Sequence, residues 1–188
     1  MTRVARWIDY HDMPPEEEKV QIRQCIETIE KLCGYPPRGW YTGRLSPRSQ
    51  ALVWEIYQEK GIPLLWVSDA YSDDLPYWMD VPAEKDVPEP EGMLVLPYSL
   101  DCNDFKFSTN NGFGGPSDFF EHCKNAFDVL FEEGVGGSPK MMSIGLHCRI
   151  SGKPGRLAAL RKFVVSMATS QNDRNFRKRL ILICIRSM

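Results

Sequence analysis

The distribution of apolar and polar residues predicts an alternation of helices and strands along the chain. Apolar residues at i, i+3, i+4 and i+7 spacing predict amphipathic helices over about 14–33, 47–60, 117–134 and 154–167. Short continuous apolar runs, typical of strands covered on both faces, occur at 64–67, 93–96 and 141–146. The order helix, helix, strand, strand, helix, strand, helix indicates an α/β fold with mostly parallel strands.

Each predicted strand runs into a polar loop, over 69–78, 101–104 and 147–149 respectively. Residues 80–92, rich in proline and glutamate, read as an exposed excursion within one domain. In parallel α/β sheets and barrels, ligands bind at the carboxyl ends of the strands. Carboxylates, an amide, a histidine and an arginine converging there suit hydrolysis, because histidine transfers protons near neutral pH.

The positions of these residues in the sequence are also compatible with purely structural roles. The loop carboxylates of Asp69, Asp73 and Asp74 also suit turn caps, and His147 also suits a structural histidine bonded to backbone. Four aromatic side chains suit either a core or a substrate platform: Trp40, Tyr41, Tyr77 and Trp78.

Composition and charge narrow the class of protein. The chain has 188 residues, enough for one domain with a sizeable core, and is 43% hydrophobic and 26% charged. Its formal net charge of −2 gives no electrostatic case for nucleic acid or an anionic membrane. The first residues lack the apolar core of a signal peptide, and no apolar run approaches the length of a membrane span. We therefore expect a soluble cytoplasmic protein.

The cysteines and histidines predict neither disulfides nor a metal centre. Six cysteines are scattered without a Cys-x-x-Cys pair, so free thiols are expected. The three histidines, His11, His122 and His147, are far apart, and none lies at ligand spacing from a second histidine or cysteine. The sequence predicts no metal and no other cofactor.

Five separated segments together resemble one group of enzymes. They are Arg6-Trp7-Ile8-Asp9-Tyr10, Gly39-Trp40-Tyr41-Thr42-Gly43-Arg44, the segment 68–78, the segment 97–104 and Met142-Ser143-Ile144-Gly145-Leu146-His147-Cys148-Arg149. Their order and spacing resemble the allantoinase-like branch of the polysaccharide-deacetylase superfamily, with its NodB-homology domain. Asp118-Phe119-Phe120 and the segment 127–134 resemble the same branch. The likeness covers roughly residues 6–165.

The resemblance implies a distorted (β/α) barrel with its site at the carboxyl ends of the strands. It implies hydrolysis of a non-peptide carbon–nitrogen bond in an amide, without a bound metal. In this branch the implied reaction opens the cyclic ureide allantoin to allantoate. Sister branches remove N-acetyl groups from chitin or peptidoglycan.

The resemblance also implies roles for individual residues. His147 resembles the general acid that protonates the leaving nitrogen, with Asp69 and Asp74 as further catalytic residues from the segment that orients it. The substrate-binding residues expected with them are Trp40, Tyr41, Arg44, Asp73, Trp78, Asp101, Asn103, Asp104 and Arg149.

The sequence departs from the family pattern in two places. Metal-dependent members carry a His-x-x-x-His motif at the start of this region, whose two positions here hold Arg3 and Trp7. A (β/α) barrel usually needs about 250 residues, so we expect a partial barrel that lacks N-terminal strands. Residues 1–170 are then the C-terminal part of the hydrolase domain. The basic and apolar tail over 171–188 no longer resembles the family, and it is either a closing strand or an altered reading of the gene.

Three functions stay open. The first is an allantoinase-like amidohydrolase, and the second is an N-deacetylase of chitin or another amino-sugar polymer. The third is a truncated, non-catalytic chain that associates with itself or a partner. The expected ligand is a small ureide or an N-acetylated sugar. A partial barrel exposes strand edges that need covering, so a homo-oligomer is also expected.

Overall fold

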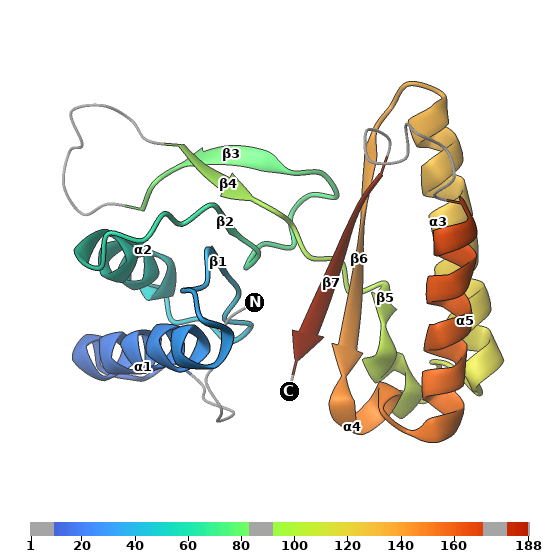
Figure 1. Cartoon of the computed structure of the whole chain (residues 1–188), viewed down its shortest axis with the longest axis horizontal. Helices are drawn as coiled ribbons and strands as arrows, with labels where there is room; N and C mark the ends of the chain where they lie inside the picture. The colour runs from blue at the N-terminus through green and yellow to red at the C-terminus, as the bar shows by residue number, and fades with distance from the viewer. Residues whose placement is uncertain (1–9, 83–91, 171–179, 188) are drawn as a thin grey trace. The chain divides into compact units, whose positions relative to one another are not determined.

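The computed structural model describes residues 10–82, 92–170 and 180–187. The chain divides into two compact units, Met1–Tyr98 and Ser99–Met188, which are described separately (Figure 1). Both combine helices with a sheet, which confirms the predicted α/β class. No helix in the described part of the chain is long and apolar enough to cross a membrane.

The first unit packs two helices, α1 (Pro15–Cys33) and α2 (Ser49–Glu59), against a four-stranded sheet. The strands are β1 (Gly39–Trp40), β2 (Trp66–Val67), β3 (Tyr77–Asp80) and β4 (Gly92–Val95). Their order in the sheet is β1-β2-β4-β3, with β1, β2 and β4 parallel. Both helices match the ranges predicted from periodicity to within two residues at each end.

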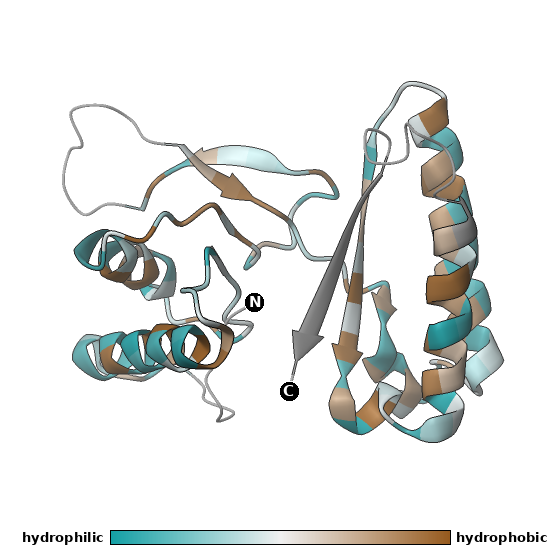
Figure 2. Ribbon diagram, viewed as in Figure 1, coloured by the Kyte–Doolittle hydropathy of each residue, from teal (hydrophilic) through white to brown (hydrophobic). Residues whose placement is uncertain are grey.

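Apolar side chains from both helices and the sheet form the core of this unit. Figure 2 shows brown along β2 and β4 and on part of each helix, with teal over the remaining helical surface. The buried residues are Ile22, Cys25, Ile26, Trp40, Leu52, Val53, Ile56, Tyr57, Val67, Met93 and Val95. Glu18 is buried beside this core, where its carboxylate accepts hydrogen bonds from the Ser46 and Ser49 hydroxyls at the start of α2.

The strand β3 was not predicted, because its residues lie in a segment read as loop. Tyr77–Asp80 pair antiparallel with Gly92–Val95, and Tyr77 lies opposite Val95. The pairing partner lies beyond the segment 83–91, so nothing local in the composition of 69–80 indicated a strand. The predicted excursion over 80–92 therefore connects two paired strands, and its residues 83–91 lie outside the described part.

The second unit contains a parallel sheet of β5 (Cys102–Asn103), β6 (Lys140–His147) and β7 (Leu180–Ser187), in the order β5-β6-β7. Two long helices, α3 (Pro116–Val135) and α5 (Pro154–Ser170), lie side by side along this sheet (Figure 1). A 3₁₀ turn, η1 (Asp104–Ser108), follows β5, and the short α4 (Cys148–Ser151) follows β6. The buried core is Cys102, Phe119, Cys123, Phe127, Met142, Ile144, Ala159, Phe163 and Met167.

Part of the tail forms a strand. Leu180–Ser187 pairs in parallel with the whole of β6, from Lys140 opposite Leu180 to His147 opposite Ser187. Of the interpretations that the sequence allowed for the tail, this pairing supports a closing strand. Residues 171–179 and 188 lie outside the described part.

Candidate active site

His147 is the last residue of β6 and the residue immediately before α4. Its backbone is extended, with φ −111° and ψ 126°, so no strain is needed to leave the strand there. The residue is 9% exposed, and pairing with the neighbouring strands fixes the position of its main chain. The sequence predicted this placement at the carboxyl end of a buried strand.

The partner of the His147 ring is Asp104. The Asp104 carboxylate is fully buried, and its Oδ1 lies 2.6 Å from Nδ1 of His147. Its Oδ2 accepts three further hydrogen bonds, from the His147 amide at 2.8 Å, the Ser151 amide at 3.2 Å and the Ser151 hydroxyl at 2.6 Å. Four donors around one carboxylate compensate for its removal from water.

This arrangement determines which ring nitrogen is free to react. An ionised carboxylate only accepts hydrogen bonds, so Nδ1 of His147 carries a hydrogen and donates a hydrogen bond to Asp104. Nε2 is then the nitrogen at which His147 gains or loses its exchangeable proton. The negative charge of Asp104 also stabilises the imidazolium, which is the form that acts as a general acid.

The turn η1 holds Asp104 in place. The Asn103 side chain caps this turn, because its Oδ1 accepts a hydrogen bond of 2.7 Å from the Phe105 amide. The Phe105 ring lies 5.9 Å from the His147 ring between centroids, and Phe105 is half-exposed. Asn103 and Asp104 were predicted to bind substrate. In the structure Asn103 caps η1, and the buried Asp104 carboxylate is bonded to His147 and Ser151. Their predicted contacts with substrate stay predictions.

Asp101, also predicted to bind substrate, lies just before β5. Its Oδ1 accepts a hydrogen bond of 3.0 Å from Lys106, and its Oδ2 lies 3.1 Å from Nε2 of His122. Burial alone would raise the pKa of this carboxyl, but the Lys106 ammonium and His122 outweigh that effect and lower it. Arg149, on α4, is exposed.

In the first unit, Asp69 follows β2 and holds the loop that follows β1. Its buried carboxylate accepts hydrogen bonds from the Thr42 amide at 2.7 and 2.9 Å and from the Gly43 amide at 2.8 Å. Gly43 has φ +82°, a left-handed conformation that suits glycine. The contacts of Asp69 are those of a residue that positions the 42–43 loop. Its predicted catalytic role stays a prediction.

Three other predicted residues of this unit are exposed: Asp73, Asp74 and Trp78. The Asp73 carboxylate accepts hydrogen bonds from the Asp74 and Leu75 amides in a local turn. Local bonding of this kind is the turn-cap role that the sequence left open.

The aromatic residues after β1 divide between core and loop. Trp40 is a core residue, because its indole N–H donates to Thr42 Oγ1 at 2.8 Å and its ring packs edge-on against Tyr57. Its predicted role in substrate binding stays a prediction. The Tyr41 hydroxyl lies 3.3 Å from that of Tyr71, and burial together with this contact raises the pKa of Tyr41. The neighbouring Arg44 is exposed.

The hydrogen bonds between Asp69 and the 42–43 loop lead to a stability prediction. Asp69→Ala removes the acceptor for two backbone amides near the core, and each buried donor left unpaired costs about 1–3 kcal/mol. We expect the free energy of unfolding to fall by about 2–4 kcal/mol, measured by urea denaturation. Asp73→Ala, which removes an exposed local turn contact, should cost less than about 1 kcal/mol. Equal losses in the two variants would contradict the structural role of Asp69.

Sequence reasoning missed Ser151 and the role of Asp104. Ser151 lies four residues after His147, a spacing that places both on one side of a helical turn. That signal was weak, because α4 is only one turn long. Asp104 is 43 positions from His147 in the chain, so only the pairing of β5 with β6 brings the two together.

Comparisons with known proteins place this geometry in a family. No protein-family model matches the chain. A Schizosaccharomyces pombe protein described as "Putative polysaccharide deacetylase" is 41% identical over 170 residues, covering 88% of this chain and 53% of that protein. A crystal structure of PuuE allantoinase is 43% identical with a TM-score of 0.72, over 94% of this chain and 52% of that one. The crystal structure of a probable polysaccharide deacetylase from Pseudomonas aeruginosa PAO1 is 42% identical with the same TM-score, over 94% and 53%.

The likeness in sequence and the likeness in fold agree. These matches identify the chain as a member of the polysaccharide-deacetylase superfamily, related both to proteins described as polysaccharide deacetylases and to an allantoinase. The chain spans about half the length of each of these relatives.

Proposed function

We propose that the chain carries the proton-donating part of a hydrolase site, and that the reaction is the opening of a cyclic ureide of the allantoin type. The observation that carries the proposal is the buried Asp104–His147 pair at the carboxyl end of β6. This pair occurs in a chain that is 43% identical to an allantoinase over 94% of its own residues.

The Asp104–His147 pair would assist the difficult step of amide hydrolysis, which is the departure of the nitrogen. Hydrolysis adds the hydroxyl of water to the carbonyl carbon and a proton to the nitrogen, while the bond between carbon and nitrogen breaks. Nitrogen leaves poorly as an anion, so protonation must accompany the cleavage. Nε2 of the His147 imidazolium supplies that proton, and the Asp104 carboxylate fixes the ring and stabilises its charged form.

The proposed site does not depend on the metal used by some members of this superfamily. By the resemblance of the N-terminal segment, the two metal-binding histidine positions hold Arg3 and Trp7. Neither side chain offers a lone pair of the kind that zinc requires. The proposal is therefore metal-independent hydrolysis, with His147 as general acid.

N-deacetylation of an amino-sugar polymer is the second candidate. It is favoured by the relatives from S. pombe and P. aeruginosa, which are described as polysaccharide deacetylases. Both reactions break a carbon–nitrogen bond of an amide and need the same proton donor, so the His147 geometry supports either. They differ in the product released, which makes them separable by assay.

The test compares the two substrates directly. The 188-residue chain, and a form extended to the length of its relatives, are incubated separately with allantoin and with N-acetylated chitin oligosaccharides. We expect allantoate to form with at least one of the two protein forms, and no acetate. Release of acetate alone would establish the second candidate. A folded, extended form that turns over neither substrate would contradict both and favour a non-catalytic chain.

A further inference from the structure

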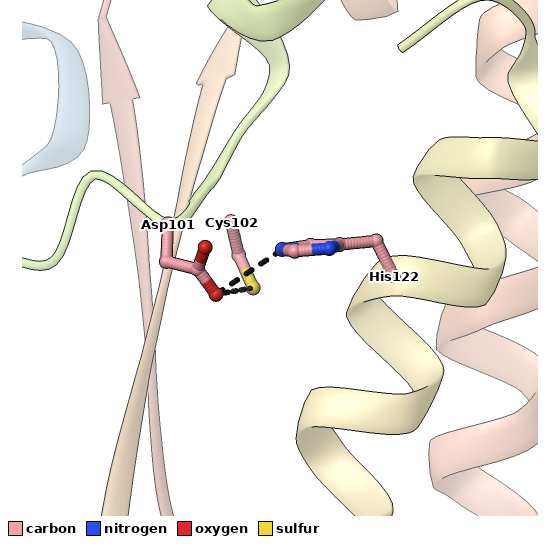
Figure 3. A group of neighbouring side chains, drawn as sticks. All are labelled: Asp101, Cys102 and His122. Atoms are coloured by element: carbon pink, nitrogen blue, oxygen red, sulfur yellow. Dashed lines mark hydrogen bonds and ion pairs between the residues drawn. The ribbon is translucent and has the colours of Figure 1, made fainter. Parts of the chain in front are cut away.

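The second unit brings together three side chains of the types that bind transition metals. They are Asp101, just before β5, Cys102, the first residue of β5, and His122, on α3. Figure 3 shows the carboxylate, the thiol and the imidazole of these residues converging, with the ring of His122 directed toward the other two side chains. One ligand atom from each lies within 4.8 Å of the others. None of the three takes part in the contacts between His147 and Asp104.

We propose that Asp101, Cys102 and His122 form a zinc-binding site that links β5 to α3. A thiolate, an imidazole and a carboxylate together are typical of zinc rather than of magnesium or calcium, which prefer oxygen ligands alone. One thiolate and one carboxylate also balance the two charges of the ion. Water occupies the fourth position of the tetrahedron.

The distances between the ligand atoms suit such a site. Zinc bonds of about 2.0–2.3 Å at tetrahedral angles place neighbouring ligand atoms about 3.3–3.6 Å apart. Oδ2 of Asp101 lies 3.1 Å from Nε2 of His122 and 3.9 Å from Sγ of Cys102. These two separations fall on either side of the expected range and close to it.

Neighbouring groups orient the ligands, as outer-shell groups do in known metal sites. Lys106 bonds to Oδ1 of Asp101, which leaves Oδ2 directed at His122. The Phe113 ring packs edge-on against the imidazole of His122, with centroids 5.5 Å apart. The side chains of Asp101 and His122 are 57% and 35% exposed, so an ion can reach the cluster from solvent.

The sulfur ligand is Cys102 rather than its neighbour Cys123. Cys123 is fully buried, and the group of ligand atoms that lie within 4.8 Å of one another includes the Cys102 thiol.

This site was not predicted from spacing along the sequence. The sequence offered no histidine at ligand spacing from a second histidine or cysteine, but Cys102 and His122 are 20 positions apart and the packing of β5 against α3 brings them together. Because Cys102 is two residues before Asp104, a bound ion would also secure the segment that positions His147.

The test measures zinc bound to the full chain, expressed without a histidine tag and purified under reducing conditions. After loading and dialysis against zinc-free buffer, we expect about one zinc ion per chain by elemental analysis. Cobalt in its place should give a thiolate charge-transfer band. His122→Ala, Cys102→Ser and Asp101→Asn should each weaken binding by at least about 100-fold, since even outer-shell changes cost 10–100-fold.

Matched controls separate this site from general thiol or histidine binding. Cys33→Ser and His11→Ala, which change exposed residues of the first unit, should leave the zinc content unchanged. A thermal unfolding midpoint raised by zinc, and raised less in Asp101→Asn, would support the link between β5 and α3. The proposal is overturned if the folded chain retains no zinc, or if His122→Ala and Asp101→Asn retain it as the parent does. Loss of zinc in His147→Ala, with retention in His122→Ala, would place the metal at the candidate active site instead.

Discussion

His147→Ala is expected to lower kcat by about 10²–10⁴, the usual contribution of one general acid, while the fold is kept. The reason is the geometry of the ring: Nδ1 is committed to Asp104, so Nε2 is the nitrogen available for proton transfer. Alanine removes this donor, and the leaving nitrogen must then depart without it. The measurement is steady-state turnover of allantoin, or of an N-acetylated sugar if that is the substrate, in whichever form of the protein is active.

A control variant and a check of folding accompany this prediction. His11→Ala changes an exposed residue of the first unit and should alter kcat by less than about tenfold. Circular dichroism of both variants checks that the fold survives. Wild-type turnover in a folded His147→Ala variant would show that the proton donor lies elsewhere, and would remove the observation on which the proposed function rests.

Asp104→Asn is expected to lower kcat by about 10²–10⁴ as well, because the Asp104 carboxylate holds the His147 ring. An amide at this position can offer a donor to Nδ1, which favours the wrong tautomer of the His147 ring. It also removes the negative charge that stabilises the imidazolium. Because Asp104 acts through the His147 ring, the loss should appear in kcat rather than in KM.

The split between kcat and KM distinguishes positioning from a merely structural role. Ser151→Ala removes one donor to Asp104 but leaves the contact with His147 intact, so it should change kcat by less than about tenfold. Asp104→Asn with nearly normal kcat would contradict the assignment. A loss of folding in Asp104→Asn would be seen by circular dichroism, and Asp104→Glu then provides the variant that keeps the charge.

The helices and the buried strands followed from local pattern. Periodic apolar residues predicted α1, α2, α3 and α5, because a helix that packs on a core needs one apolar face and this face recurs every three to four residues. Continuous apolar runs predicted β2, β4 and β6 for a similar reason, since a strand covered on both faces has no polar side. The same logic placed His147 at the carboxyl end of β6.

The tertiary structure alone decided which residues meet. Tyr77–Asp80 become a strand because β4 lies beside them, and Leu180–Ser187 become one because β6 does. Asp104 and His147 are 43 residues apart, and parallel pairing of β5 with β6 brings the carboxylate to the ring. The sequence by itself determined the α/β class, the main elements and the position of His147 at the end of a strand, because these depend on side chains a few positions apart. The partner of His147, the core position of Trp40 and the cluster of Asp101, Cys102 and His122 depend on contacts between distant segments, which only the packed chain specifies.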